Sequence, residues 1–325
     1  MSAVRPGEGA FSRKSREGLD SGGPSQEAVT FDFGERGRSR SPRYSRYPLY
    51  PQSSTRSPEH LRGPDHPPTV GRYAVGGRPP RLTDSILLAG RIHAALVELS
   101  DGSSTFTGCD REGRPLVGHN HAFILPESVE GLGRGRDGEV THVTVYAPAG
   151  FGSRERAALE SLREVRGDGI GADLTLLALG HPGDFGGSDA AGGGSPLLAE
   201  SRIWTSRTPF IPTRYPKATR AGAPKLDASG KQIGSPEHEL LRLLGLAGFP
   251  EPAAVEAVSF TEIAGERVGW ASFQRARTCG DGRRAGSAGY GFRIEFAEPV
   301  RGPVAVGYGA HFGINLVLCN INSAN

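Results

Sequence analysis

Residues 140–147 have the sequence VTHVTVYA. Valine, threonine and tyrosine dominate this run, and such residues predict a β-strand. Residues 153–165, SRERAALESLREV, follow with apolar residues at helical spacing behind Ser153, which can cap the helix. Residues 173–179, DLTLLAL, predict a further strand. Together these runs predict a strand–helix–strand unit.

A similar unit precedes this one. Residues 70–75 predict a short strand, residues 82–99 a helix with Thr83 as its cap, and residues 122–125 a strand. A glycine-rich turn, residues 131–138, separates the two units. The combined order, β-α-β-β-α-β, is typical of the ferredoxin-like fold.

The order recurs in the second half, although its final helix is not visible. The expected elements there are a strand at 202–211, a helix at 236–246, and strands at 254–262, 268–274, 292–296 and 304–306. We therefore expect an α+β protein with tandem ferredoxin-like units, residues 69–185 and 201–325, joined by a linker at residues 186–200.

Composition limits what else the chain can be. The 325 residues include 48 Gly and 25 Pro, which argues against a coiled coil or a long helical bundle. Residues 1–68 are rich in Ser, Gly, Pro and Arg, and we expect a disordered basic tail there. No run approaches the roughly 20 apolar residues that cross a bilayer, and no signal peptide is visible. We expect a cytoplasmic protein without a membrane partner.

The densest group of chemically active residues is GHNHAFILP, residues 118–126. In an extended segment, His119 and His121 project to the same side, with α-carbons roughly 7 Å apart. Two imidazoles so placed suit a general base and a general acid. They can equally be surface or hydrogen-bonded histidines, or two ligands of a metal with His142 or His311 as the third. Because no H-E-x-x-H motif, carboxylate cluster or C-x-x-C pair accompanies them, we predict no metal and no cofactor.

A glycine-rich segment, GPVAVGYGAHFGIN, occupies residues 302–315. Glycine lets backbone amides approach a phosphate closely, which makes the segment a candidate phosphate-binding loop. Its spacing is that of neither a Rossmann fingerprint nor a P-loop, and a tight hairpin is the alternative interpretation.

A third motif interleaves basic and aromatic residues: RIWTSRTPFIPTRYPK, residues 202–217. Cations suit phosphates and rings suit bases, so the motif is typical of single-stranded RNA binding, although the rings can also be core residues. The candidate RNA-binding cations are Arg207, Arg214, Lys217 and Arg220.

With these motifs and the D-G-x-x-x-H-V-x-V-x-A-P-x-G-F segment at 137–151, the chain resembles the fused repeat-processing subunit of type I-U (I-G) CRISPR systems. That family joins a backbone-clamping domain to an endoribonuclease domain of the RAMP superfamily. The resemblance covers residues 70–317. Family members usually carry a further domain ahead of this region, so we expect a split or truncated gene, a misassigned start or a shortened variant.

The resemblance implies metal-independent cleavage of CRISPR precursor RNA by 2′-hydroxyl attack, leaving a 2′,3′-cyclic phosphate. It assigns His119 or His121 as the base, with the other as acid or orienting group and His311 as the alternative acid. Tyr308 and the amides of Gly307 and Gly309 would hold the phosphate. The expected partners are precursor RNA, crRNA and other subunits of an interference complex. A catalytically silent crRNA-binding subunit and a truncated, non-functional fragment are the alternatives.

Overall fold

The structure is a computed structural model, and it describes residues 66–116, 118, 120–128, 138–167, 169–186, 194–273 and 288–319. Most of the tail expected at residues 1–68 lies outside these residues, as do parts of the expected linker.

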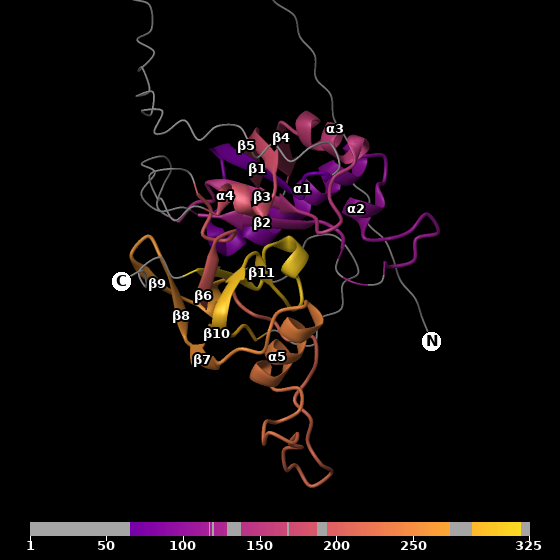
Figure 1. The fold of residues 1–325 in the computed structure, drawn as a ribbon. Helices are drawn as coiled ribbons and strands as arrows, with labels where there is room; N and C mark the ends of the chain where they lie inside the picture. Colours follow the sequence, from indigo (N-terminus) through magenta and orange to yellow (C-terminus); the bar gives the residue numbers. More distant parts are fainter. Residues whose placement is uncertain are drawn as a thin grey trace, which may run out of the picture. The chain divides into compact units, whose positions relative to one another are not determined.

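The first half forms a five-stranded antiparallel sheet with the order β2-β3-β1-β5-β4 (Figure 1). The first, second, third and last strands of the unit lie in the ferredoxin-like order, and β4 is an added edge strand. Its elements are β1 (Val70–Arg78), the turn η1 (Leu82–Asp84), α1 (Ser85–Leu99), α2 (Ser104–Thr107), β2 (Phe123–Glu127), β3 (His142–Tyr146), α3 (Ser153–Ser161), β4 (Glu164–Gly167), β5 (Ile170–Gly180) and α4 (Pro182–Phe185).

The second half repeats this order in a sheet arranged β11-β12-β6-β10-β7. Here β11 is the added edge strand, and it borders the last strand as β4 does in the first sheet. The expected α+β class with tandem ferredoxin-like units is confirmed. The elements are β6 (Glu200–Ser206), α5 (Pro236–Leu246), β7 (Ala254–Val258), β8 (Phe260–Ile263), β9 (Glu266–Gly269), η2 (Trp270–Ser272), β10 (Gly291–Arg301), β11 (Val304–Ala305), η3 (Ala310–Phe312) and β12 (Leu316–Cys319).

Several expected elements differ from those observed. The helix α3 ends at Ser161, because Val165 turns inward and the following residues pair with β5 as a new edge strand. The expected strand at 254–262 is divided into β7, which joins the second sheet, and β8, which pairs with β9 in a separate hairpin. The predicted helix caps were also wrong. Thr83 lies before the observed N-cap, Asp84, and Ser153 is already the first helical residue of α3.

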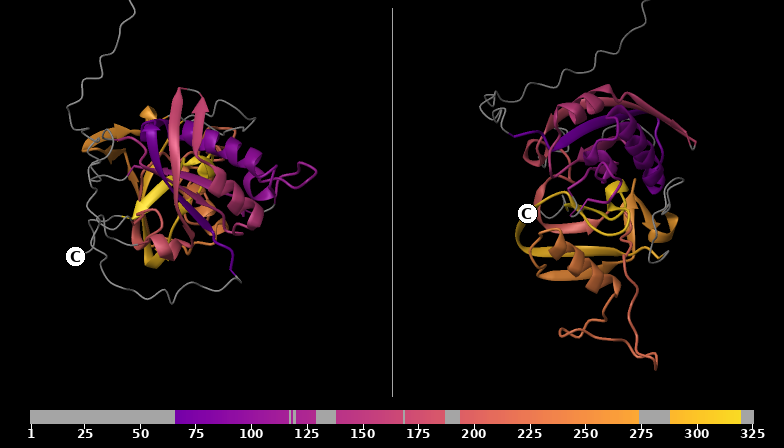
Figure 2. Two further views of the ribbon diagram at one scale, coloured as in Figure 1. Left: turned by 90° about the horizontal axis from the view of Figure 1, so that it is seen from above. Right: turned by 90° about the vertical axis from the view of Figure 1, so that its right-hand side faces the viewer.

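Each sheet buries one face under helices. In the first half, α1 and α3 lie side by side on the sheet (Figure 2) and enclose a core that includes Tyr73, Ile92 and Phe151. In the second half, α5 covers a core built around Trp204 and Phe296. Burial of such large side chains contributes about 1.5–3 kcal/mol each.

A smaller cluster of buried residues joins the two halves. Phe123 and Leu125 of β2 pack with Leu197, which precedes β6, and with Ala310 and Leu316 of the second half. The edge strand β2 of the first sheet therefore lies against the C-terminal loop that precedes β12. This contact positions the candidate site.

A buried polar network lies in the same strands. Arg72 Nη1 on β1 donates to Glu127 Oε1 on β2 at 2.6 Å and to Thr144 on β3 at 3.0 Å. The hydroxyls of Thr144 and Ser195 both donate to the Glu127 carboxylate, each at 2.6 Å. Arg72 and Glu127 are almost fully buried, so each charge depends on the other for compensation.

Among the helices of the described residues, none is both long enough and apolar enough to span a membrane.

Candidate active site

Two of the predicted catalytic histidines meet face to face. The ring centroids of His121 and His311 lie 3.6 Å apart, and the ring planes are inclined by 13°. His121 lies two residues before the start of β2 in the first half, whereas His311 lies in η3 of the second half. Both residues are half-buried, so the pair is neither sealed in the core nor fully solvated.

His311 is fixed from its second face as well. The ring of Phe123 stacks on it with a centroid separation of 3.8 Å. The Nδ1 atom of His311 lies 3.1 Å from the carbonyl oxygen of Ala122, and a carbonyl can only accept a hydrogen bond. A neutral His311 that donates to this carbonyl therefore carries its proton on Nδ1.

Glycines let these segments approach one another. A β-carbon on Gly313 would lie 2.5 Å from Pro126 Cδ, so only glycine allows the loop to reach β2 this closely. Gly108, at the C-cap of α2, has φ of 68°, and a β-carbon there would lie 3.0 Å from the His121 ring. The hydrogen bond from the Ala122 amide to Thr105 O, 2.7 Å, holds the chain beside α2.

A third histidine, which the sequence did not single out, contacts the residue that follows His311. His93 on α1 meets Phe312 edge to face, with ring centroids 5.1 Å apart, and its Nε2 lies 3.0 Å from Phe106 O. It occupies the row of helix positions that includes Ile86 and Val97, both of which pack against apolar clusters. A histidine within an apolar row was the signal available for finding it.

The glycine-rich loop presents two backbone amides. The amides of Tyr308, Ala310, Phe312 and Ile314 donate to carbonyl oxygens nearby. Within the described residues, the amides of Gly307 and Gly309 donate to no acceptor. Both glycines are partly exposed, so these two amides are free to bind an anionic oxygen.

The loop is braced by buried side chains. The side-chain amide of Asn315 donates to Tyr308 O at 2.6 Å, and its oxygen accepts from the amide of Ile211. The Tyr308 ring packs against the apolar cluster of Ile86, Ile211 and Ile314. This packing makes Tyr308 a support of the loop.

The predicted RNA-binding cations lie in two settings. Arg214, Lys217 and Arg220 are exposed on a long excursion between β6 and α5 that extends away from the sheet (Figure 1). Backbone bonds such as Lys217 N to Ile233 O, 2.8 Å, pair its two arms. We call residues 213–234 the basic arm. Arg207 lies apart from it and donates to Glu262 O of β8.

The basic arm is more basic than the sequence motif indicated. Lys225 and Lys231 lie on it with Lys217, so it holds three of the four lysines of the chain. Asp227 is its acidic residue, with a pKa lowered by hydrogen bonds, first from the Ser229 hydroxyl. The arm thus carries a formal charge excess of four positive units.

The remaining candidates lie elsewhere or outside the described residues. His119 is outside them. His142 lies half-buried on β3, where burial and then the charge of Arg72 lower its pKa. Within the described part of the chain, no three His, Cys, Asp or Glu side chains gather as metal ligands would.

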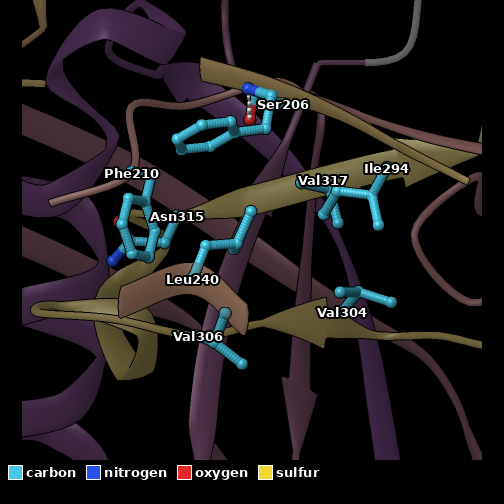
Figure 3. Close-up of a pocket in the computed structure, with 9 residues that line it drawn as sticks. Ser206, Phe210, Leu240, Ile294, Val304, Val306, Asn315 and Val317 are labelled. Carbon is cyan, nitrogen blue, oxygen red and sulfur yellow. Dashed lines mark hydrogen bonds between the residues drawn. The ribbon is translucent and has the colours of Figure 1, made fainter. Parts of the chain in front are cut away.

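A small cavity in the second core is not a site for a ligand. It lies between Leu240, Val304 and Val317 under the second sheet (Figure 3). Its volume is about 10 Å³, which is room for about one water molecule.

The fold and the stacked pair define the class of protein: two ferredoxin-like units with paired imidazoles where they meet. No family model matches the chain, and no curated protein matches it. Among solved structures, the chain is similar to one described as a Cas6 product complex, with 13% sequence identity. The match covers 77% of this chain and 99% of that chain, with a TM-score of 0.33.

Proposed function

We propose that the chain is a metal-independent endoribonuclease that cleaves CRISPR precursor RNA within its repeats. The observation that carries the proposal is the stack of His121 on His311 beside the two unbonded glycine amides. The sequence motifs shared with the repeat-processing family and the charge of the basic arm support the same assignment.

The reaction needs one proton acceptor and one proton donor. The base removes the proton of a ribose 2′-hydroxyl, and the 2′-oxygen then attacks the neighbouring phosphorus. The bond from phosphorus to the 5′-oxygen breaks, and the acid protonates that oxygen. The products are a 2′,3′-cyclic phosphate and a 5′-hydroxyl, so atoms and charges balance without water or metal.

The stacked pair supplies both functions. Two imidazolium rings 3.6 Å apart repel each other, so the pair binds one proton more readily than two. A pair that holds one proton would supply one neutral ring and one protonated ring. We propose that one of these two rings acts as the base and the other as the acid. His119 remains a further candidate for either role.

The glycine loop would stabilise the negative charge that grows on the phosphate. The amides of Gly307 and Gly309 are preorganised donors on the loop that carries His311. Removing one such donor in other enzymes costs about 100- to 1,000-fold in rate. Exposed cations of the basic arm, among them Arg214 and Lys217, would bind the flanking strand.

The experiment is cleavage of repeat RNA by the purified full chain, with the product ends mapped in the presence of EDTA. We expect a 2′,3′-cyclic phosphate end and a loss of at least about 100-fold in rate for His121→Ala or His311→Ala. His66→Ala replaces an exposed histidine and serves as the matched control. Loss of wild-type cleavage in EDTA contradicts the mechanism, and RNA binding without cleavage identifies a silent binding subunit.

If the proposal holds, the chain acts in the cytoplasm on precursor RNA and passes crRNA to other interference subunits.

A further inference from the structure

A second cavity is lined by two residues that contact or adjoin His311, namely Phe123 and Ala310. It has a volume of about 290 Å³, and its walls include Phe123, Leu246, Ala247, Ala310 and the backbone of Gly307. Phe123 is the residue that stacks on His311, and Ala310 precedes His311 in the chain. Whatever fills this cavity therefore lies next to the proposed catalytic pair.

One charged side chain, Arg242 of α5, also lines the cavity. Its Nε donates to Glu239 Oε2 at 2.8 Å and its Nη2 to Glu239 Oε1 at 2.7 Å. This two-point bond uses one edge of the planar guanidinium. The other edge is formed by Nη1 and the second hydrogen of Nη2. Nη2 also makes a long contact, 3.5 Å, with the Thr213 hydroxyl, whereas Nη1 bonds to no acceptor within the described residues.

The charge of Arg242 is already balanced. Glu239 is fully buried, and burial alone would raise its pKa, but the bonds from Arg242 and Thr213 outweigh burial and lower it. The carboxylate is thus ionised at neutral pH, and the pair is neutral overall. A neutral pair with donors left over suits an uncharged ligand with adjacent acceptors better than a phosphate.

The walls specify the remaining properties of the ligand. Phe123 offers an aromatic ring, and Leu246 and Ala247 form an exposed apolar rim. A volume of about 290 Å³ lies at the small end of ligand pockets, which span roughly 300–1,000 Å³. One planar heterocycle fits such a space, whereas a dinucleotide cofactor does not.

We propose that this cavity binds a guanine base of the RNA strand next to the scissile phosphate. Guanine presents its O6 and N7 acceptors side by side, and the arginine fork donates to both, whereas adenine places an amino donor where O6 would be. This inference rests on the proposed function, since it places the base beside the stacked histidines. It adds a base preference that the catalytic pair cannot supply.

The experiment measures binding of RNA nonamers that cannot be cleaved, because every 2′-oxygen is methylated. One has a single guanine within uridines, one a single adenine, and one only uridines. We expect the wild-type chain to bind the guanine nonamer about tenfold more tightly than the other two. Equal affinity for the three nonamers overturns the proposal.

Two variants locate the preference in the cavity. Ala247→Trp fills the mouth, and Arg242→Lys keeps the charge beside Glu239 but lacks the fork. Both are expected to bind all three nonamers alike. Gly245→Trp is the matched control, since it adds the same ring to the same helix end where a side chain meets open space, and it should retain the preference. A preference that survives both cavity variants refutes the assignment.

The outcomes also separate this inference from the nuclease proposal. If the preference is present and repeat RNA is not cleaved, the guanine site stands and the nuclease assignment fails. If repeat RNA is cleaved and all nonamers bind alike, the nuclease stands and the guanine site fails.

Discussion

Gly108 packs closely against the ring of His121, a catalytic candidate. Its backbone has φ of 68°, and a β-carbon added there would lie 3.0, 3.1 and 3.2 Å from three atoms of the His121 ring. Because carbon atoms pack best at about 3.5–4.0 Å, Gly108→Ala must move the ring by about 0.5 Å. The ring is confined on its other side by His311, so the stack itself has to shift.

The variant has two separable effects. A left-handed backbone costs a residue other than glycine roughly 1–2 kcal/mol, which lowers the free energy of unfolding. A displacement of 1 Å in an active site can cost about 100-fold in rate, so a shift of half that distance predicts a loss on the order of tenfold.

Gly113→Ala is the matched control. Gly113 lies in the same loop with φ of 77°, and an added β-carbon would meet no atom within 4 Å. Both variants should lose similar stability in chemical denaturation. Only Gly108→Ala should lose single-turnover cleavage of repeat RNA and shift the His121 ring resonances in NMR spectra. Equal cleavage and unchanged His121 resonances in the two variants would refute the reasoning.

Three further predictions concern binding and stability. Replacing Arg214 and Lys217 with Ala should weaken RNA binding. It should also reduce the slope of log affinity against log salt by about 1.4, since each single-strand phosphate contact contributes about 0.7. An unchanged slope would mean that the RNA does not bind at the basic arm. The lowered pKa of His142 means that the unfolded chain binds its proton more readily, so the stability it contributes is complete above its ordinary value of 6.5 and is lost as pH falls below that value. Denaturation of His142→Gln at pH 7.5 and 5 should show a smaller loss than the wild type, and an equal loss excludes this group. Glu127→Gln should lower the free energy of unfolding by about 3–5 kcal/mol, because it leaves Arg72 buried without its counter-charge. Adding Arg72→Met should recover much of this loss. If the double variant recovers no stability, packing rather than charge compensation dominates.

The sequence pattern alone predicts the bounds of a helix that has a capping residue and regularly spaced apolar residues. The helix α5 has the bounds that the sequence predicts, because Ser235 caps it, Pro236 begins it and its leucines recur on one face. The end of α3 lacked such a signal, since Arg163 and Glu164 suit a helix equally well. Pairing with β5 decides its conformation, and that pairing is a tertiary contact.

In the candidate site, too, part could be predicted from local sequence and part depends on tertiary contacts. The sequence singled out His121 and His311 by their neighbours, but nothing in either segment indicates that the two meet. Their contact follows from the repeated topology. In the first unit, α3 lies between the third strand and the edge hairpin, whereas in the second unit β11 and η3 lie between β10 and β12. The loop that takes the place of the second helix carries His311 and packs against β2. Because this loop replaces the second helix of the second unit, a histidine of that unit reaches the first unit.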